Sequence, residues 1–416
     1  MRISMRASGV AVGITALLAG LALTGCGSVS SGPGTGAGSS VTSTASGAPG
    51  RSSTTPVGAT PTVSAPASTP AATPAPTPAG GPVPKGFAAT SVTFVSTDEA
   101  FVLGTAPCVN KPCTSIVRTL DRGASWVGLP APVTPLADPY GSSGPGAWGI
   151  RFASPSAGFV FGNGLWATTD GGEHWSSVAG PGGAIVDLEV IDGQLLALSD
   201  NCSAQSGCSP SETLYRRALA GGSWHVVTHV SNARVIATQA RVAAVLDGTS
   251  VVITGDGGLT FATHASPCAS PASGGSSVAV TGPDSLALLC AGGAAAGQVQ
   301  KTVYVSADLG VHWTKAGSPP IGGDPWGISA GAPAGLVVAA ASGATWLYSS
   351  ADGGAQWVTS YKAIDGGAGF NDLGFTTTTD GVAVLGPAYT DGNSYGMPGE
   401  LLLTSNGGMT WQAVTW

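Results

Sequence analysis

The segment TTDGGEHW (residues 168–175) joins a tight turn to an aromatic side chain, and it recurs along the chain. Asp-Gly-Gly is typical of a turn, whereas a tryptophan needs a packed environment. We call each copy of the pattern Ser/Thr-x-Asp/Asn-x-Gly-x-x-Trp/Phe a box. Six segments match it: TLDRGASW (119–126), TTDGGEHW (168–175), TGDGGLTF (254–261), SADLGVHW (306–313), SADGGAQW (350–357) and TSNGGMTW (404–411).

A seventh, degenerate copy, RALAGGSW (217–224), keeps the glycine and the tryptophan. The last residues of the seven copies are spaced 49, 49, 37, 52, 44 and 54 positions apart. A repeat of this length is typical of array architectures. The seven aromatic residues are Trp126, Trp175, Trp224, Phe261, Trp313, Trp357 and Trp411.

Two strands joined by a short turn precede each box, as in VTFVSTDEAFVLG (92–104) and IRFASPSAGFVFG (150–162). A third short strand leads into the box, and the box turn begins a fourth. Four strands per repeat, seven times over, predict an all-β fold. We expect a single seven-bladed β-propeller with four-stranded blades over residues 85–416, preceded by a disordered linker.

These repeats resemble the Asp-box, or BNR, repeat of sialidases, sortilin-type receptors, xyloglucanases and the photosystem II assembly-factor type of propeller. The resemblance implies that each box joins the third and fourth strands at the rim. It also implies that the acidic side chain accepts N–H groups of its own turn, that a glycine such as Gly172 takes a positive φ, and that the aromatic residue packs between strands or blades. The acidic or amide positions are Asp121, Asp170, Asp256, Asp308, Asp352 and Asn406. Glu173 and His174 occupy positions that the repeat leaves free, so we expect no shared chemistry there.

The N-terminal region has the features of a bacterial lipoprotein. A basic start and an apolar run end in LTGC (23–26), which matches a lipobox. We expect residues 1–25 to be a signal peptide and Cys26 to be diacylated; an uncleaved anchor helix is the alternative. Residues 26–84 are rich in Ser, Thr, Pro, Ala and Gly and predict a disordered tether. The predicted location is therefore the outer face of the cytoplasmic membrane, in the cell envelope.

Six cysteines remain after Cys26, and an even number in an exported chain predicts three disulfides. Proximity and elimination pair Cys108 with Cys113, Cys202 with Cys208, and Cys268 with Cys290. A zinc site is the alternative for such spacings, but no CxxC occurs and no histidine is interleaved.

Composition excludes one class of partner. Without the signal peptide the chain has 13 Lys and Arg against 22 Asp and Glu, a net charge of −9. An acidic surface without a basic stripe argues against nucleic acid. No P-loop, nucleophile elbow or helical zinc motif occurs, so we expect no metal and no cofactor. We expect a monomer that contacts the membrane through its lipid.

A propeller has two faces. The turns after the first and third strands share one, which we call the box face, and the loops after the second and fourth strands share the other, which we call the loop face. The longest loops and the six cysteines map to the loop face, so we expect a ligand to bind there. Stapling against proteolysis explains the cysteines equally well.

Aromatic and acidic residues of the loop face are candidates for contact with a ligand. They are Tyr140, Trp326, Tyr389, Asp391 and Tyr395. Trp326 also precedes a glycine at the start of an inner strand, as Trp148 does, and this repetition favours a core position for both.

A charged group is expected near the central axis. In IVDLEVID (185–192), Asp187 and Glu189 lie on the same side of an inner strand. Blade alignment makes Glu189 equivalent to Arg151 of the preceding blade, which predicts an Arg151–Glu189 ion pair. We expect this pair to be structural rather than a binding site.

Two functions compete. The first is a lipid-anchored, non-enzymatic binding or assembly module for a protein or a cell-envelope glycan. The second is a glycoside hydrolase similar to sialidases. Sialidases use three arginines, yet the last arginine here is Arg241. Hydrolysis also needs two carboxylates that face a cleft, and nothing in the sequence identifies the second wall of such a cleft. We therefore favour the binding module.

Overall fold

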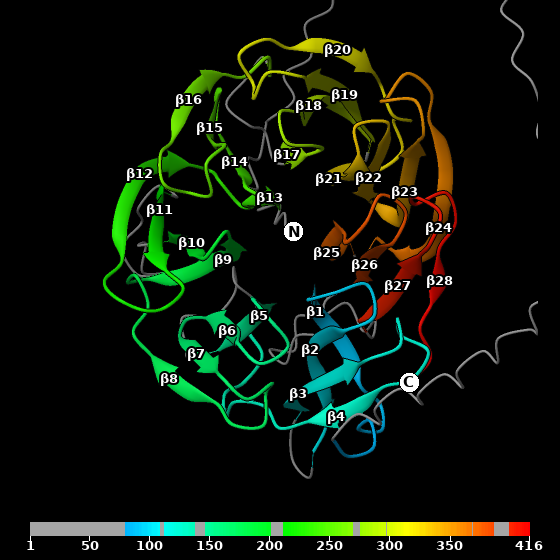
Figure 1. Ribbon diagram of the computed structural model, residues 1–416. Helices are drawn as coiled ribbons and strands as arrows, with labels where there is room; N and C mark the ends of the chain where they lie inside the picture. The colour runs from blue at the N-terminus through cyan, green and yellow to red at the C-terminus, as the bar shows by residue number, and fades with distance from the viewer. Residues whose placement is uncertain are drawn as a thin grey trace, which may run out of the picture. The chain divides into compact units, whose positions relative to one another are not determined.

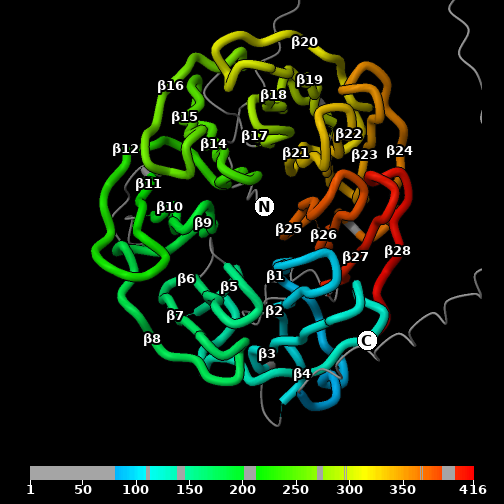
Figure 2. The backbone as a smooth tube through the Cα atoms, viewed as in Figure 1, coloured from blue at the N-terminus to red at the C-terminus, as the bar shows by residue number. Residues whose placement is uncertain are grey.

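The computed structural model describes residues 80–108, 112–137, 146–200, 211–268, 275–296, 298–367, 369–386 and 399–416. These residues form 28 strands in seven four-stranded antiparallel sheets around a central axis (Figure 1). The backbone tube shows the same ring of blades (Figure 2). The prediction of an all-β, seven-bladed propeller is confirmed. No segment of this described part forms a helix long and apolar enough to cross a membrane.

Each blade is one contiguous stretch whose strands follow one another from the axis to the rim. The strands of blades one to four are β1 (Ala88–Phe94), β2 (Ala100–Pro107), β3 (Pro112–Thr119), β4 (Val127–Leu129), β5 (Ala147–Phe152), β6 (Gly158–Gly162), β7 (Leu165–Thr168), β8 (Ser176–Val178), β9 (Ala184–Ile191), β10 (Gln194–Asp200), β11 (Ser211–Ala218), β12 (His225–Ser231), β13 (Ala237–Gln239), β14 (Val242–Asp247), β15 (Ser250–Thr254) and β16 (Ala262–Ala265). The strands of blades five to seven are β17 (Ser277–Val280), β18 (Leu286–Ala295), β19 (Gln298–Ser306), β20 (Thr314–Gly317), β21 (Asp324–Ala332), β22 (Gly335–Ala341), β23 (Gly343–Ser350), β24 (Val358–Gly366), β25 (Phe370–Phe375), β26 (Gly381–Leu385), β27 (Glu400–Thr404) and β28 (Gln412–Ala413).

The second strand of a blade has an apolar middle because both of its faces are covered by neighbouring blades. Neighbouring side chains of a strand point to opposite faces. In β10, Leu195 and Ala197 pack against blade two, whereas Leu196 and Leu198 pack against blade four. All four are fully buried. Burial of one leucine contributes about 1.5–3 kcal/mol, so the interfaces between blades stabilise the ring substantially.

The ring closes without exchange of a strand between the first and last blades, because each of them supplies its own four strands. The N–H of Ala89 donates to the carbonyl of Gly399 at 3.0 Å. At the rim, the ring of Trp416 packs edge-on against Phe87 at 4.8 Å and against Trp126 at 5.1 Å. Side-chain packing therefore joins the two ends of the described chain.

The boxes form the turns between the third and fourth strands, and side chains hold them. Thr168 Oγ1 accepts the N–H of Gly172 at 3.0 Å and donates to Asp170 Oδ1 at 2.8 Å. The same carboxylate oxygen accepts the N–H of His174 at 3.0 Å. Gly172 has a φ of 91°, which a residue with a Cβ rarely adopts. The hydroxyl of the first residue and the carboxylate of the third therefore hold the turn together.

The seventh position of the box also contributes, which differs from the sequence-based expectation. Nδ1 of His174 lies 2.7 Å from Asp170 Oδ2, and Nδ1 of His312 lies 2.6 Å from Asp308 Oδ2. In the blade-four box, Thr260 makes the equivalent bond. Short polar or imidazole side chains close the turn onto the acid, so this position is not free.

The aromatic residue at the end of a box packs at the boundary between blades. The indole N–H of Trp175 donates to the carbonyl of Pro130 in the preceding blade at 3.1 Å. Trp224 of the degenerate box makes the corresponding bond to the carbonyl of Ala179, also at 3.1 Å. The degenerate box has lost its acid but keeps this connection between blades.

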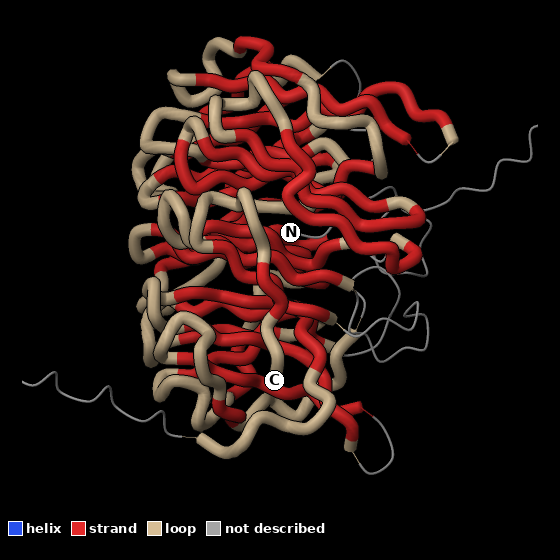
Figure 3. Tube along the Cα trace, turned by 90° about the vertical axis from the view of Figure 1, so that its right-hand side faces the viewer, coloured by secondary structure: helices blue, strands red, loops and turns tan. Residues whose placement is uncertain are grey.

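The two faces are separated clearly when the ring is seen from the side (Figure 3). Two predicted disulfides, Cys108–Cys113 and Cys268–Cys290, are confirmed. The third prediction, for Cys202 and Cys208, lies outside the described residues. Cys268 and Cys290 are buried in the interface between blades four and five, so this bond also belongs to the core.

Replacing the first residue of a box tests its structural role. Thr254 is 1% exposed, and its Oγ1 accepts the N–H of the buried Gly258 at 3.0 Å. Thr254→Val keeps the side-chain shape but leaves that donor unsatisfied, which costs about 1–3 kcal/mol. Urea unfolding should show this loss. Thr263→Val, at an exposed position of β16, serves as the control and should change stability by less than about 0.5 kcal/mol.

Candidate functional site

The inner strands of the seven blades surround a cavity of about 320 Å³ at the axis. Its lining comes from the middle and the C-terminal ends of these strands, such as Val92, Asp187, Val278, Ile328 and Asp372. Because every inner strand ends in a turn of the box face, the cavity lies in the half of the channel nearer that face.

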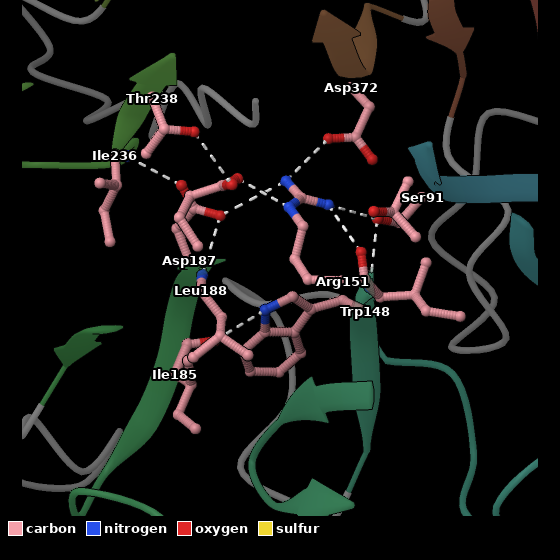
Figure 4. A network of polar contacts seen from close by, with 12 residues as sticks. Ser91, Trp148, Arg151, Ile185, Asp187, Leu188, Ile236, Thr238 and Asp372 are labelled. Carbon is pink, nitrogen blue, oxygen red and sulfur yellow. Dashed lines mark hydrogen bonds and ion pairs between the residues drawn. The ribbon is translucent and has the colours of Figure 1, made fainter. Parts of the chain in front are cut away.

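Arg151 of β5 is the centre of a polar network beside the cavity (Figure 4). Its Nε lies 2.7 Å from Glu189 Oε1, and one terminal nitrogen, Nη2, lies 3.3 Å from Asp372 Oδ1 and 3.6 Å from Asp187 Oδ1. The other terminal nitrogen donates to the Ser91 hydroxyl at 3.3 Å. One guanidinium therefore contacts three carboxylates from blades three and seven and a hydroxyl of blade one.

The three carboxylates also accept hydrogen bonds from residues of other blades. Asp187 Oδ2 accepts the N–H of Ile236, before β13, at 2.8 Å. Asp372 Oδ2 accepts the N–H of Val92 in β1 at 2.9 Å. Glu189 Oε2 accepts the hydroxyl of Thr238 at 3.3 Å. Blades seven, one, two, three and four are consequently linked by one continuous set of polar contacts.

Burial and mutual charge shift the pKa values of these groups. Burial acts to lower the pKa of Arg151, but attraction by Glu189, Asp372 and Asp187 raises it above its ordinary value. Burial and repulsion by Glu189 raise the pKa of Asp187 to about 7, although Arg151 acts in the opposite direction. The channel thus holds a permanent cation and a carboxyl group that titrates near neutrality.

The opposite wall of the channel is apolar or small. Val278 and Val280 of β17 and Ile328 and Ala330 of β21 line it, and Ser329 adds a hydroxyl. Blades five and six supply these residues, whereas the charged residues come from blades two, three and seven. The charged groups of the channel therefore gather on one side, whereas the side chains of Val278, Val280 and Ile328 are buried in the clusters between blades.

The expected Arg151–Glu189 pair is present, and Asp187 lies in the same network. The sequence analysis missed Asp372 and Ser91. Asp372 precedes Leu-Gly-Phe as Asp187 precedes Leu-Glu-Val, so aligning these two inner strands could have identified it.

Of the loop-face candidates the structure describes Trp326, which has a core position. Trp326 packs with the hydrophobic cluster between blades six and seven. Trp148 is 2% exposed, and its indole N–H donates to the carbonyl of Ile185 at 2.9 Å. Tyr140, Tyr389, Asp391 and Tyr395 lie outside the described residues, as does Cys26.

A second buried cation lies away from the channel lining. Lys301 of β19 is fully buried, and its Nζ donates to the carbonyls of Val299, Pro320, Ile321 and Gly322 at 3.0–3.1 Å. Burial lowers the pKa of Lys301 to about 8. Four carbonyl acceptors occupy this ammonium group, so it holds the loop between β20 and β21 in place.

No family model and no curated protein matches this chain. Among solved structures, the fold is similar to "YCF48 bound to D1 peptide" at 17% identity and a TM-score of 0.51, covering 78% of this chain and 95% of that one. YCF48 from Cyanidioschyzon merolae gives 14% identity and a TM-score of 0.51, covering 78% and 97%. A GH74 enzyme from Niastella koreensis has 13% identity, and the match covers 78% of this chain and 71% of that one. Its TM-score of 0.27 is too low to indicate a shared fold. At these identities the likeness to YCF48 concerns the fold alone.

Removing the guanidinium tests how far the ring depends on it. Arg151→Met should lower the free energy of unfolding by about 3–5 kcal/mol, because three buried carboxylates lose their shared cation. Arg122→Met is the matched control, since Arg122 pairs with Asp98 on the exposed rim. Thermal and urea unfolding of both variants measure the difference. An Arg151 variant as stable as the control would contradict the role of the network.

The raised pKa of Asp187 predicts a pH dependence. Between its ordinary value of 3.8 and about 7, the folded chain retains a proton that the unfolded chain releases. The Asp187 contribution to stability therefore falls as pH rises through this window. Asp187→Asn lacks this titration but can still accept the N–H of Ile236. The melting temperature of the variant should rise relative to the unaltered protein from pH 4.5 to 7.5, and equal differences at both pH values would refute the assignment.

Proposed function

We propose that this chain is a non-enzymatic binding module, held at the outer face of the cytoplasmic membrane by a lipid on Cys26, whose propeller binds a protein partner. The central cavity carries this proposal. It has a volume of about 320 Å³, within the range of about 300–1,000 Å³ that is usual for ligand sites. Charged groups of blades two, three and seven line one side of it, so the cavity suits a ligand with a polar group.

The fold comparison supports a protein as the partner. A propeller of similar fold has been solved as "YCF48 bound to D1 peptide". The same fold hosts many activities, so the likeness supports the choice of a peptide ligand without assigning which peptide.

The bonding of the channel carboxylates favours binding over hydrolysis. Glycoside hydrolysis needs a protonated acid and a second carboxylate that faces the sugar. Asp187 can hold a proton near neutral pH, but its two oxygens accept the N–H groups of Leu188 and Ile236. Glu189 and Asp372 are engaged by Arg151. These commitments leave the carboxyl groups suited to holding blades together.

Binding of a protein can be tested in cells that make the full chain. Chemical cross-linking of intact cells, followed by mass spectrometry, should recover peptides of one envelope protein joined to the propeller. In parallel, the purified full chain is tested for binding on a glycan array and for turnover of fluorogenic sialosides and xyloglucan oligosaccharides. Selective glycan binding without a protein cross-link, or glycoside turnover that Asp187→Asn abolishes, would overturn the proposal.

The anchor is tested separately. Mass spectrometry of the N-terminal peptide should find an acylated Cys26 and no residue before it. Cys26→Ala should move the protein from the membrane fraction to the soluble exported fraction, because the acyl chains supply the membrane affinity. Cys108→Ala, which leaves the lipobox intact, should stay with the membrane. An unacylated Cys26 would remove the anchor from the proposed function.

A further inference from the structure

The outer strand of blade six has a long free edge. β24 has nine residues, whereas the outer strands of blades one, two, four, five and seven have two to four. It is the last strand of its sheet and lies at the outside of the ring (Figure 1). An edge strand presents a row of unpaired N–H and C=O groups, and proteins protect such edges by keeping them short or by placing proline there. β24 has neither protection, since its sequence VTSYKAIDG contains no proline.

Blade one shows that a rim edge of this ring accepts an additional extended segment. Gly81, which precedes the first strand, forms an antiparallel bridge with Gly128 of β4. The N–H of Gly81 donates to the carbonyl of Gly128 at 3.0 Å, and the N–H of Gly128 donates to the carbonyl of Gly81 at 2.8 Å. The chain therefore covers the outer edge of blade one with its own residues.

The other long outer strand, β12 of blade three, has seven residues and is partly covered. The N–H of Ser231 at its end donates to Asp247 Oδ1 of blade four at 2.7 Å. The backbone of β24 differs, because within the described residues its hydrogen bonds go to β23 alone. Of the two long edges, β24 is thus the one left free along its outer side.

The side chains of β24 indicate what kind of segment would pair with it. Lys362 is exposed, and its Nζ lies 5.9 Å from the ring centre of Trp346. Ile364 is 88% exposed and projects from the same face, two residues further on. The acid of this strand, Asp365, is engaged, because its Oδ1 accepts the N–H of Gly367 at 2.9 Å. An added segment therefore meets a cation and an aliphatic side chain at alternate positions.

Cross-strand neighbours attract when they are oppositely charged or both apolar. The complementary segment therefore carries an acidic residue opposite Lys362 and an aliphatic residue opposite Ile364. The register between β23 and β24 shifts twice, between the partners of Leu347 and Tyr348 and between those of Gly343 and Thr345. Such bulges bend an edge, which favours a short added segment over a long strand and opposes growth by further copies.

We propose that the free edge of β24 pairs with a short extended segment of the protein partner, which adds a fifth strand to blade six. The segment carries an acidic residue and an aliphatic residue two positions apart. This proposal rests on the proposed function and deepens it by naming a contact outside the channel. Backbone hydrogen bonds hold the segment, while Lys362 and Ile364 select its side chains.

The direct test uses a phage-displayed library of random dodecapeptides, selected on the immobilised full chain. Enriched peptides should share an acidic and an aliphatic residue two positions apart, and a synthetic copy should bind in fluorescence anisotropy. Lys362→Glu should weaken that binding at least fivefold, and a copy with lysine in place of the acid should restore it. No enriched sequence, or enriched peptides that Lys362→Glu leaves unaffected, would overturn the proposal.

N-methylation of the selected peptide separates backbone pairing from side-chain contact. In a paired strand, the N–H groups of alternate residues point to the same neighbour. N-methyl groups on the residues that face β24 should weaken binding at least tenfold, whereas the same groups on the intervening residues should change it less than twofold. Equal effects of the two sets would refute the addition of a strand.

A matched pair of variants locates the edge. Ile364→Asn removes the aliphatic contact and should weaken binding of the selected peptide at least threefold. Val226→Asn, at a 55% exposed position of β12, should bind as the unaltered chain does. Circular dichroism and melting curves confirm that both variants are folded. An equal loss in both variants would reject β24 as the site.

Sedimentation of the full chain tests whether a second copy takes the same edge. The unaltered chain and Ile364→Asn should both sediment as monomers. A dimer of the unaltered chain that Ile364→Asn dissociates would show that a second copy occupies β24, and it would overturn the assignment to a partner.

Failure of this inference is distinguishable from failure of the proposed function. A cellular partner that cross-links equally to the unaltered chain, Lys362→Glu and Ile364→Asn would leave the binding module in place but refute pairing at β24. Peptide binding at β24 without any cellular protein partner would support the edge and refute the proposed function.

Discussion

The guanidinium of Arg151 satisfies a constraint that the closed ring imposes on its centre. Seven inner strands converge there, and those of blades three and seven bring three carboxylates close together. Asp187, Glu189 and Asp372 could not be buried together without a cation, because isolated charges are costly in an apolar interior. One planar group with several donors meets carboxylates from two blades and links them through backbone bonds to two more.

Hydrophobic and polar interactions lie at different distances from the central axis. Between the axis and the rim, each pair of neighbouring blades shares an apolar cluster, such as the one joining β10 to blade two. Such contacts stabilise the ring. The directional bonds at the axis and the box turns at the rim fix where each blade sits. Lys301 performs a comparable role between blades five and six, where its ammonium group donates to three carbonyls of the connecting loop.

The repeat made the blade number and the strand order predictable, because box spacing reflects one supersecondary unit. Blade alignment also predicted the Arg151–Glu189 pair, since equivalent inner positions of neighbouring blades face each other. Asp372 is 221 residues from Arg151, and closure of the ring brings the two together, so a comparison limited to blades two and three missed it. The roles of Thr168 and His174 were missed for another reason: hydrogen bonds within a turn depend on geometry that residue type alone does not specify.

The contiguous blades give this chain an unusual freedom in where it begins. Trp416 packs against Phe87, so the two ends of the described propeller meet at one seam, and no strand crosses it to complete a distant blade. Joining these ends by a short linker and opening the chain between two other blades would preserve every sheet. Such circular permutants would alter the order of synthesis while retaining the ring. In evolutionary terms, the same organisation allows a whole blade to be gained or lost as one uninterrupted segment of sequence.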